Sequence, residues 1–371
     1  MAYLVLLALA ALDSAGYSII APVVPAIGEE TGAGPAVMGA LVASFAIGQL
    51  VGYPLAGRGI QRRHAVAVLS ASLALIVVGD LGFIAGGGLG VYFPARLLQG
   101  IGAGGLWIGT AFAVLERFPG EEYRRLAGLS AVYGLGAIAG PAIGGSGGIR
   151  TPFAIHLALV TAAGAALLLL GSPRSSVRFR SDRRALRSPG FWVASAGILL
   201  VALTLGTFDG PLPLHFAEHL SQAEIGALYV VAALVGAACA AIAGHLPPRP
   251  MLWVATFLMP AAISLGGLSE MVAVWIFVAV LAGMGVGTGE AGSLGVFLEA
   301  IGTEKIVLAM VVWSQIWAIG YLAGPAVGGI IAETLGYGAI GLVPLAAALL
   351  VVAAFSYQQV RAQAQSGASR A

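Results

Sequence analysis

Twelve runs of apolar residues limit how this chain can fold more than any other feature of its sequence. They lie near residues 3–25, 36–57, 64–85, 91–115, 126–147, 152–171, 190–213, 224–245, 250–268, 271–298, 306–331 and 337–358. A helix needs about 20 apolar residues to cross the lipid hydrocarbon, and strands of a barrel would alternate apolar and polar residues instead. Only 9% of the residues are charged, too few to cover a water-soluble surface. We therefore expect an all-α polytopic membrane protein with 12 transmembrane helices.

The second half of the chain repeats the first. Residues 136–145 read GAIAGPAIGG and residues 320–329 read GYLAGPAVGG, at an offset of 184. Two further matches support the repeat: Gly100, Gly102, Gly104, Leu115 and Glu116 align with Gly283, Gly285, Gly287, Leu298 and Glu299 at an offset of 183, and residues 39–41 align with 226–228 at an offset of 187. We expect two pseudo-symmetric six-helix bundles, residues 1–171 and 190–371, joined by a basic linker at 172–189.

Lysine and arginine predict the orientation. With the N-terminus in the cytoplasm, 16 of the 18 basic residues fall in inner loops, the linker or the C-terminal tail. Arg150 is then in an outer loop, and Arg96 lies within a helix. Because positive charge is retained on the cytoplasmic side, we expect a multi-pass protein of the inner membrane with both termini cytoplasmic.

Three local motifs add a resemblance to a known family. Arg96-Leu-Leu-Gln-Gly100-Ile-Gly102 resembles the helix-4 motif of the major facilitator superfamily. The helix-5 motif associated with antiporters is matched by Gly136, Gly140, Pro141, Gly144 and Gly145, and repeated in helix 11 by Gly324 and Pro325. Asp13 precedes Pro22 by nine residues, as in the branch of twelve-helix drug:proton antiporters that includes tetracycline exporters and vesicular monoamine transporters.

The family's motif in the loop between helices 2 and 3 is only partly present. Gly57 stands where the motif has aspartate, and Ile60 stands where it has glycine. Gly52, Arg58 and Arg62 remain as candidate gating residues. We expect Glu116 and Glu299, at matching helix ends, to pair with loop arginines such as Arg58 or Arg62.

Three residues inside apolar runs are the main candidates for chemistry. A carboxylate at membrane depth is costly, and loss of water favours its neutral form, so Asp13 and Glu290 could exchange a proton for a substrate. The resemblance implies that helices 1 and 10 line a central cavity, although inter-helix hydrogen bonding would explain both acids. Arg96 needs a partner because it stays charged. Proton coupling, pairing with Asp80 or Asp13, and capping of helix-1 carbonyls remain open.

Aromatic residues are candidates for lining the cavity. Trp313, Trp317 and Tyr321 recur every four residues and so share a helix face. Such rings can stack on a lipophilic cation, although bundle packing explains the pattern equally well. The other residues that we expect near the cavity are Trp107, Tyr133 and Gln49.

We therefore interpret the chain as a proton-coupled secondary transporter that exports small lipophilic cationic or neutral compounds by alternating access. A symporter importing a small metabolite is the alternative, and a non-transporting receptor is a third. We expect no enzymatic activity, no cofactor beyond the proton gradient, no nucleic-acid partner and a monomer. His215-Phe-Ala-Glu218-His219 fits a zinc-protease pattern, but it lies in a short loop, and we expect no metal there.

Overall fold

A computed structural model describes residues 1–62, 65–169, 188–301 and 306–368. All regular elements in these ranges are helices. Their bounds are α1 Ala2–Ser18, α2 Ile20–Thr31, α3 Pro35–Arg62, α4 Ala65–Ala85, α5 Leu89–Arg117, α6 Glu122–Gly144, α7 Arg150–Leu168, α8 Pro189–Asp209, α9 Leu212–Phe216, α10 Gln222–Ala243, α11 Pro248–Leu268, α12 Val272–Ile301, α13 Ile306–Leu335, a short η3 Tyr337–Ala339 and α14 Leu342–Ala368.

Twelve of the helical segments are long and apolar enough to cross a membrane, which confirms the predicted number of spans. The first span is longer than predicted, because α1 and α2 together run to Thr31. The last helix, α14, continues to Ala368, so most of the predicted C-terminal tail is helical. Of the predicted linker, only Ser188 and Pro189 lie within the described residues; the Ser188 side chain caps α8 by accepting from the Phe191 backbone N–H.

The first span of each half is broken near prolines. A single turn residue, Ile19, separates α1 from α2, and Pro22 and Pro25 follow. In the second half, Gly210 and Pro211 separate α8 from α9. Proline has no N–H group and therefore cannot donate to the carbonyl four residues earlier, which frees backbone acceptors inside the bundle.

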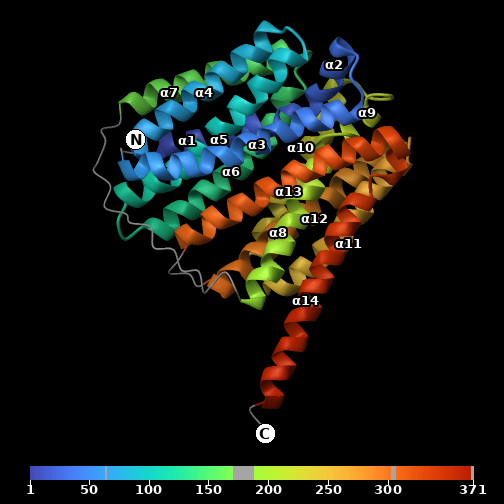
Figure 1. Ribbon diagram of the computed structural model, residues 1–371. Coiled ribbons are helices and arrows are strands. Elements are labelled where there is room, and N and C mark those ends of the chain that lie inside the picture. The colour runs from blue at the N-terminus through green and yellow to red at the C-terminus, as the bar shows by residue number, and fades with distance from the viewer. Residues whose placement is uncertain (63–64, 170–187, 302–305, 369–371) are drawn as a thin grey trace.

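The helices form two groups (Figure 1). The ends of these groups differ in the charged residues that they carry. We call the end with residues 58–62, 117–125 and 244–249 the basic end, and the end with residues 28–36, 144–150, 210–222 and 332–337 the acidic end. Across the halves, α13 packs on α3, and α10 packs on α6. At the acidic end α2 also contacts α9.

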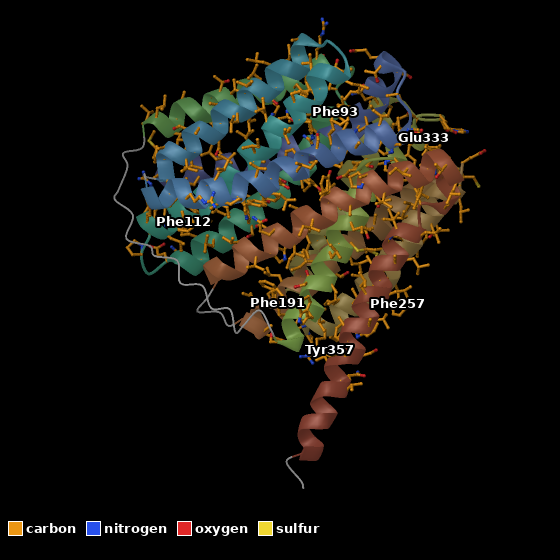
Figure 2. The ribbon with its side chains drawn as sticks, viewed as in Figure 1. Phe93, Phe112, Phe191, Phe257, Glu333 and Tyr357 are labelled. Carbon is orange, nitrogen blue, oxygen red and sulfur yellow. The ribbon has the colours of Figure 1, made fainter. Side chains whose placement is uncertain are left out.

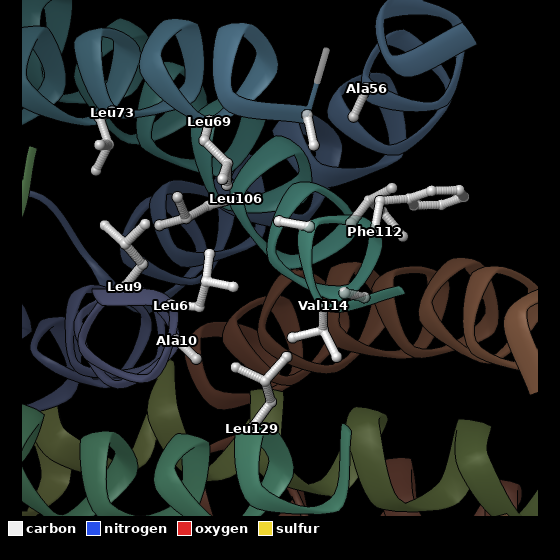
Figure 3. Packing of buried hydrophobic residues seen from close by; sticks show 14 of the residues in the cluster. Leu6, Leu9, Ala10, Ala56, Leu69, Leu73, Leu106, Phe112, Val114 and Leu129 are labelled. Carbon is white, nitrogen blue, oxygen red and sulfur yellow. The ribbon is translucent and has the colours of Figure 1, made fainter. Parts of the chain in front are cut away.

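The apolar core is continuous between the halves towards the acidic end. One buried cluster joins Phe45, Phe83 and Phe153 of the first half with Ala202 and Tyr321 of the second. Another cluster fills the basic half of the first bundle, where Leu6 and Leu9 of α1 face Leu69, Leu106 and Leu129 (Figure 3). The cluster around Phe45 and Tyr321 therefore ties the two bundles together.

The repeated glycines form equivalent contacts inside each half. A Cβ atom at Gly140 would lie 2.6 Å from the carbonyl oxygen of Ala15 on α1, and one at Gly324 would lie 3.0 Å from the amide nitrogen of Thr207 on α8. Only glycine permits this approach of two helix backbones. The neighbouring motif glycines face the same spans: Gly136 faces α1, Gly144 faces Ile19 and Pro22 at the break between α1 and α2, and Gly320 and Gly328 face α8.

Candidate functional site

Asp13 lies on α1, shortly before the break in the first span. Its side chain is buried, with 4% of its surface exposed, and its Oδ1 atom has no hydrogen-bond partner. A buried acceptor without a partner is costly and rare in native structures. No neighbouring helix donates a hydrogen bond to this oxygen, in contrast to the alternative of an inter-helix hydrogen bond.

Glu290 lies on α12 and is half-buried. It is within electrostatic range of Tyr133 on α6, which is in turn within range of Asp13. At the repeat offset of 183 residues, Glu290 corresponds to Trp107, whose Nε1–H donates to Ser314 Oγ across the halves at 3.1 Å. Both positions therefore face the opposite bundle.

Arg96 is fully buried on α5, and it binds the backbone of the first span. Its Nη1 donates to the Gly16 carbonyl at 3.1 Å, its Nη2 donates to the Tyr17 carbonyl at 2.9 Å, and its guanidinium lies 4.2 Å from the centre of the Phe45 ring. The contacts match the capping of helix-1 carbonyls. Neither Asp13 nor Asp80 bonds Arg96 directly within the described residues, and the link to Asp80 runs through Gln99.

A buried pair of Asp80 and His156 continues from Arg96. Gln99 Oε1 accepts from Arg96 at 3.0 Å, and its Nε2–H donates to Asp80 Oδ1 at 2.7 Å. The other oxygen of Asp80 lies 2.8 Å from His156 Nδ1. Neither residue was among the main predicted site residues, and Asp80 was expected only as a possible partner of Arg96, although a histidine and an aspartate within apolar spans are themselves signals of a function.

Asp209 was not among the predicted site residues either. It ends α8 with 4% of its surface exposed, and Tyr321 of α13 donates to its Oδ2 at 2.9 Å. The Tyr321 ring lies 4.7 Å from the ring of Tyr17 on α1, and Arg96 is within electrostatic range of Asp209. Tyr321 is thus a buried link between the halves, and its hydroxyl already has a partner.

The other aromatic candidates lie at the interface between the bundles. Trp313 and Trp317 stack at 5.0 Å, and Trp107 contacts the edge of Tyr133 at 5.0 Å. Trp317 packs against core clusters of both halves. Gln49 on α3 is buried, and its Oε1 has no hydrogen-bond partner, as for Asp13.

The last motif glycines close the acidic end. A Cβ at Gly226 of α10 would lie 3.0 Å from the Cα of Gly145, and a Cβ at Gly39 of α3 would lie 3.2 Å from the Cα of Gly329. The four glycines are related by the sequence repeat, so the two contacts are equivalent.

Two polar side chains bridge the halves beside these glycines. Glu333 accepts from the Ala36 N–H at the start of α3 at 2.9 Å, and it is labelled near that end of the bundle in Figure 2. Gln222 donates to the Gly144 and Gly148 carbonyls at 2.6 and 3.0 Å. The negative charge of Glu333 complements the partial positive charge at the start of α3, and the amide group of Gln222 donates to a carbonyl at the end of α6.

Glu299 pairs with an arginine of the basic end other than Arg58 and Arg62, the two arginines that the prediction named as examples. Its partner is Arg249, at 3.8 Å between Oε2 and Nε, and both side chains are half exposed. Glu116 Oε1 is buried and has no hydrogen-bond partner. Gly52 faces α5, with the Cα of Ile101 3.1 Å from an added Cβ, and Arg58 lies on α3. The Arg62 side chain is outside the described part of the chain.

Nearby at the basic end, Arg124 donates to Glu121, and this hydrogen bond holds the pKa of Glu121 below its ordinary value. No cluster of three or more metal-ligating side chains occurs in the ranges that the structure describes. His215 instead packs on Tyr337 at 4.6 Å, and its Nε2 lies 3.1 Å from the Ser269 carbonyl oxygen.

Comparison with known proteins agrees with this architecture. The family model for the Major Facilitator Superfamily matches residues 6–259. The chain belongs to this superfamily. Its twelve apolar spans and all-helical fold are those of a major facilitator transporter.

Curated relatives carry names of drug-resistance proteins. Multidrug resistance protein 2 of Bacillus subtilis (strain 168) is 26% identical over 240 residues, or 59% of this chain and 60% of the relative. Multidrug resistance protein 1 of the same strain is 28% identical over 236 residues, or 60% of each chain. Quinolone resistance protein NorA of Staphylococcus aureus (strain N315) is 28% identical over 131 residues, or 35% of this chain and 34% of the relative. The matched part spans 60% or less of these relatives.

Solved structures share the fold at low identity. A bacterial homologue of the human lysosomal transporter Spinster, inward-facing and occupied, superposes with a TM-score of 0.72 at 18% identity, covering 100% of this chain and 96% of that one. A D-xylose-proton symporter gives 0.69 at 15% identity, covering 94% and 96%.

Proposed function

We propose that the transporter exports small lipophilic cations or neutral compounds in exchange for protons. The observation that carries the proposal is the buried carboxylate of Asp13, which has an oxygen without a hydrogen-bond partner. An unpaired charge at this depth is costly, so the group would be neutral until a cation or a rearranged Arg96 compensates it. Protons and substrate would then compete for the same carboxylate.

Glu290 is the second acid in the proposal. It faces the first half from the position that matches Trp107, and Tyr133 lies in electrostatic range of both acids. The aromatic rings of Trp107, Trp313 and Trp317 supply flat apolar surfaces beside it, which suit a lipophilic cation. The drug-resistance names of the relatives support export. The transport experiment below distinguishes export from proton-driven import.

The site opens alternately to the two sides in this proposal. With both termini in the cytoplasm, the acidic end faces outward, and the glycine contacts close it in the described state. A cysteine in the 172–189 linker should react with an impermeant maleimide only from the cytoplasmic side. Reaction from outside in intact cells would overturn this orientation.

The decisive test is transport by purified protein in proteoliposomes with an imposed pH gradient, using ethidium as the probe. Wild type should accumulate ethidium on the side from which protons leave, and Asp13→Asn should abolish this uphill accumulation while leaving downhill equilibration. Glu290→Gln should lower it. Full gradient-driven accumulation in both variants and in the double variant would exclude these acids as the coupling groups. Co-accumulation of a substrate with protons would identify a symporter.

A further inference from the structure

We propose that Asp80 and His156 are positioning residues that hold the first span on both sides of Asp13. The role of Asp13 rests on the proposed function, but the hold on the span does not. Four helices contribute to it: α4 supplies Asp80, α5 supplies Gln99 and Arg96, and α7 supplies His156, while α1 supplies only backbone carbonyls.

One arm of the network ends just before Asp13. His156 Nε2 lies 3.1 Å from the Leu12 carbonyl oxygen, and Nδ1 lies 2.8 Å from Asp80 Oδ2. A carbonyl only accepts, so Nε2 carries a hydrogen and donates it. One further proton then sits between Nδ1 and Oδ2, because two lone pairs at that distance would repel.

The other arm ends just after Asp13. Arg96 only donates, so Gln99 must turn its Oε1 towards Arg96 and its Nε2–H towards Asp80. Arg96 then donates to the Gly16 and Tyr17 carbonyls. The direction of each hydrogen bond in this arm is therefore fixed by Arg96.

Two glycines make room for the network. A Cβ at Gly16 would lie 2.7 Å from His156 Cε1 and Nε2, and a Cβ at Gly79 would lie 2.5 Å from Gln99 Cγ. His156 can therefore reach α1 only where that helix has no side chain.

Asp13 needs an external hold because its own carboxylate does not provide one. Its Oδ1 has no hydrogen-bond partner, so the backbone of α1 sets its position. That backbone is bonded at Leu12 on one side, and at Gly16 and Tyr17 on the other, by a single connected network. Asp80 joins the two arms.

Asp80→Asn is the matched control, because it keeps every hydrogen bond while removing the shared proton. Its Oδ1 can accept from Gln99, and its amide N–H can donate to His156 Nδ1, which leaves Nε2–H on the Leu12 carbonyl. Asp80→Leu has similar size and removes the group that joins the two arms, so His156 and Gln99 both lose their shared partner. In His156→Asn the side chain is too short to reach the Leu12 carbonyl, and the hydrogen bond between Asp80 and Gln99 is kept.

The experiment is hydrogen–deuterium exchange of the protein in lipid nanodiscs, read by mass spectrometry at the amides of residues 12–20. Loss of buried bonds to a charged network should speed exchange there by about tenfold or more in Asp80→Leu and His156→Asn, and leave Asp80→Asn like wild type. Amides of α10 and α12 should not change in any variant. If Asp80→Leu does not fold, His156→Asn still tests the hold on Leu12.

Transport of ethidium in proteoliposomes gives the second readout. Asp80→Leu and His156→Asn, which misplace Asp13, should lower the maximal rate by about tenfold with little change in KM. Asp80→Asn should keep the wild-type rate. Wild-type exchange at residues 12–20 in both disruptive variants would overturn the proposal. So would loss of transport in Asp80→Asn with protected α1 amides, because the pair would then act through its proton. Absence of proton-driven ethidium transport in wild type would refute the proposed function instead, and exchange would still decide the hold.

Discussion

Where α5 carries Arg96 and Gln99, the matching positions of α12 are Ala279 and Ala282 at the repeat offset of 183. All four side chains are buried. In the first half the space holds a chain of hydrogen bonds, and in the second half it holds an apolar cluster that includes Trp275. The relation is reversed nearer the basic end, where Trp107 of the first half matches Glu290 of the second.

The two halves show which buried residues the helix packing requires and which it merely accommodates. The second half reaches the same helix packing with alanines, so the buried polar groups of the first half are not required to build a six-helix bundle. Buried polar groups cost free energy unless every partner is satisfied. We infer that the first half uses them to hold its first span in addition to the glycine contacts of α6, whereas α8 has only the matching glycine contacts of α13 among these two kinds of hold.

The largest expected effect on stability comes from the glycine contacts that the two halves share. Gly140→Leu and Gly324→Leu should each destabilise the protein by about 3 kcal/mol or more, because even a Cβ meets backbone atoms of the adjacent helix. Thermal unfolding and the yield of monodisperse protein in detergent measure this. A tolerated leucine at one of the two sites would break the equivalence of the halves.

A smaller effect should come from the group found in one half only. Arg96→Met leaves the Gly16 and Tyr17 carbonyls without their donor, at a cost of roughly 2–3 kcal/mol, since bonds to charged groups are the strong ones. Arg150→Met, at an exposed position, is the control and should shift unfolding by less than about 0.5 kcal/mol. Equal shifts in the two variants would mean that Arg96 does not hold the first span.

The bridges at the acidic end should show a weaker effect. Glu333→Gln removes a charge from the start of α3, which is worth about 0.3–1 kcal/mol and hence a two- to fivefold change in the closed population. Spin labels at residues 31 and 335 would report longer distances across the halves. Gln222→Glu should act in the same direction by placing a negative charge at the end of α6. Unchanged distances in both variants would show that the glycine contacts alone keep this end closed.

The smallest effect should be at the basic end, where the halves have different exposed ion pairs. The folded-state pKa of Glu121 is lowered by Arg124, so the pair adds stability above the unfolded-state pKa and loses it as the pH falls through the folded-state value. Glu121→Gln should therefore differ from wild type in Tm only slightly at neutral pH, and not at all once Glu121 is protonated. A difference that grows at acidic pH would contradict this sign.

The spans and the glycine contacts could be predicted because each depends on a short stretch of sequence. Apolar length fixes a span, and a repeated Gly-x-x-x-Gly pattern shows where backbones approach. The same patterns placed Gly140 and Gly324 at helix contacts without naming the partner helix. That Gly145 and Gly329 would meet the opposite half needed the packing of all the helices.

The partners of buried polar residues could not be predicted in this way. Arg96 had two acids and the helix-1 carbonyls as candidate partners, and the structure shows that it binds the Gly16 and Tyr17 carbonyls. Apolar patterns do not show which of these groups the packing brings to the guanidinium. His156 reaches α1 only because Gly16 faces it. Glu299 pairs with Arg249 of its own half rather than with Arg58 or Arg62, since proximity at the basic end follows the bundle.

The paired glycines at the acidic end also bear on assembly. Gly39 on Gly329 and Gly226 on Gly145 are the same contact made twice, with the two halves exchanging roles. A polypeptide of half this length would therefore bury the same surface in an isologous homodimer with a two-fold axis through the membrane. Two copies in one chain can vary independently, and Glu333 and Gln222 differ from their counterparts Ile149 and Pro35, which identical subunits of a homodimer could not do.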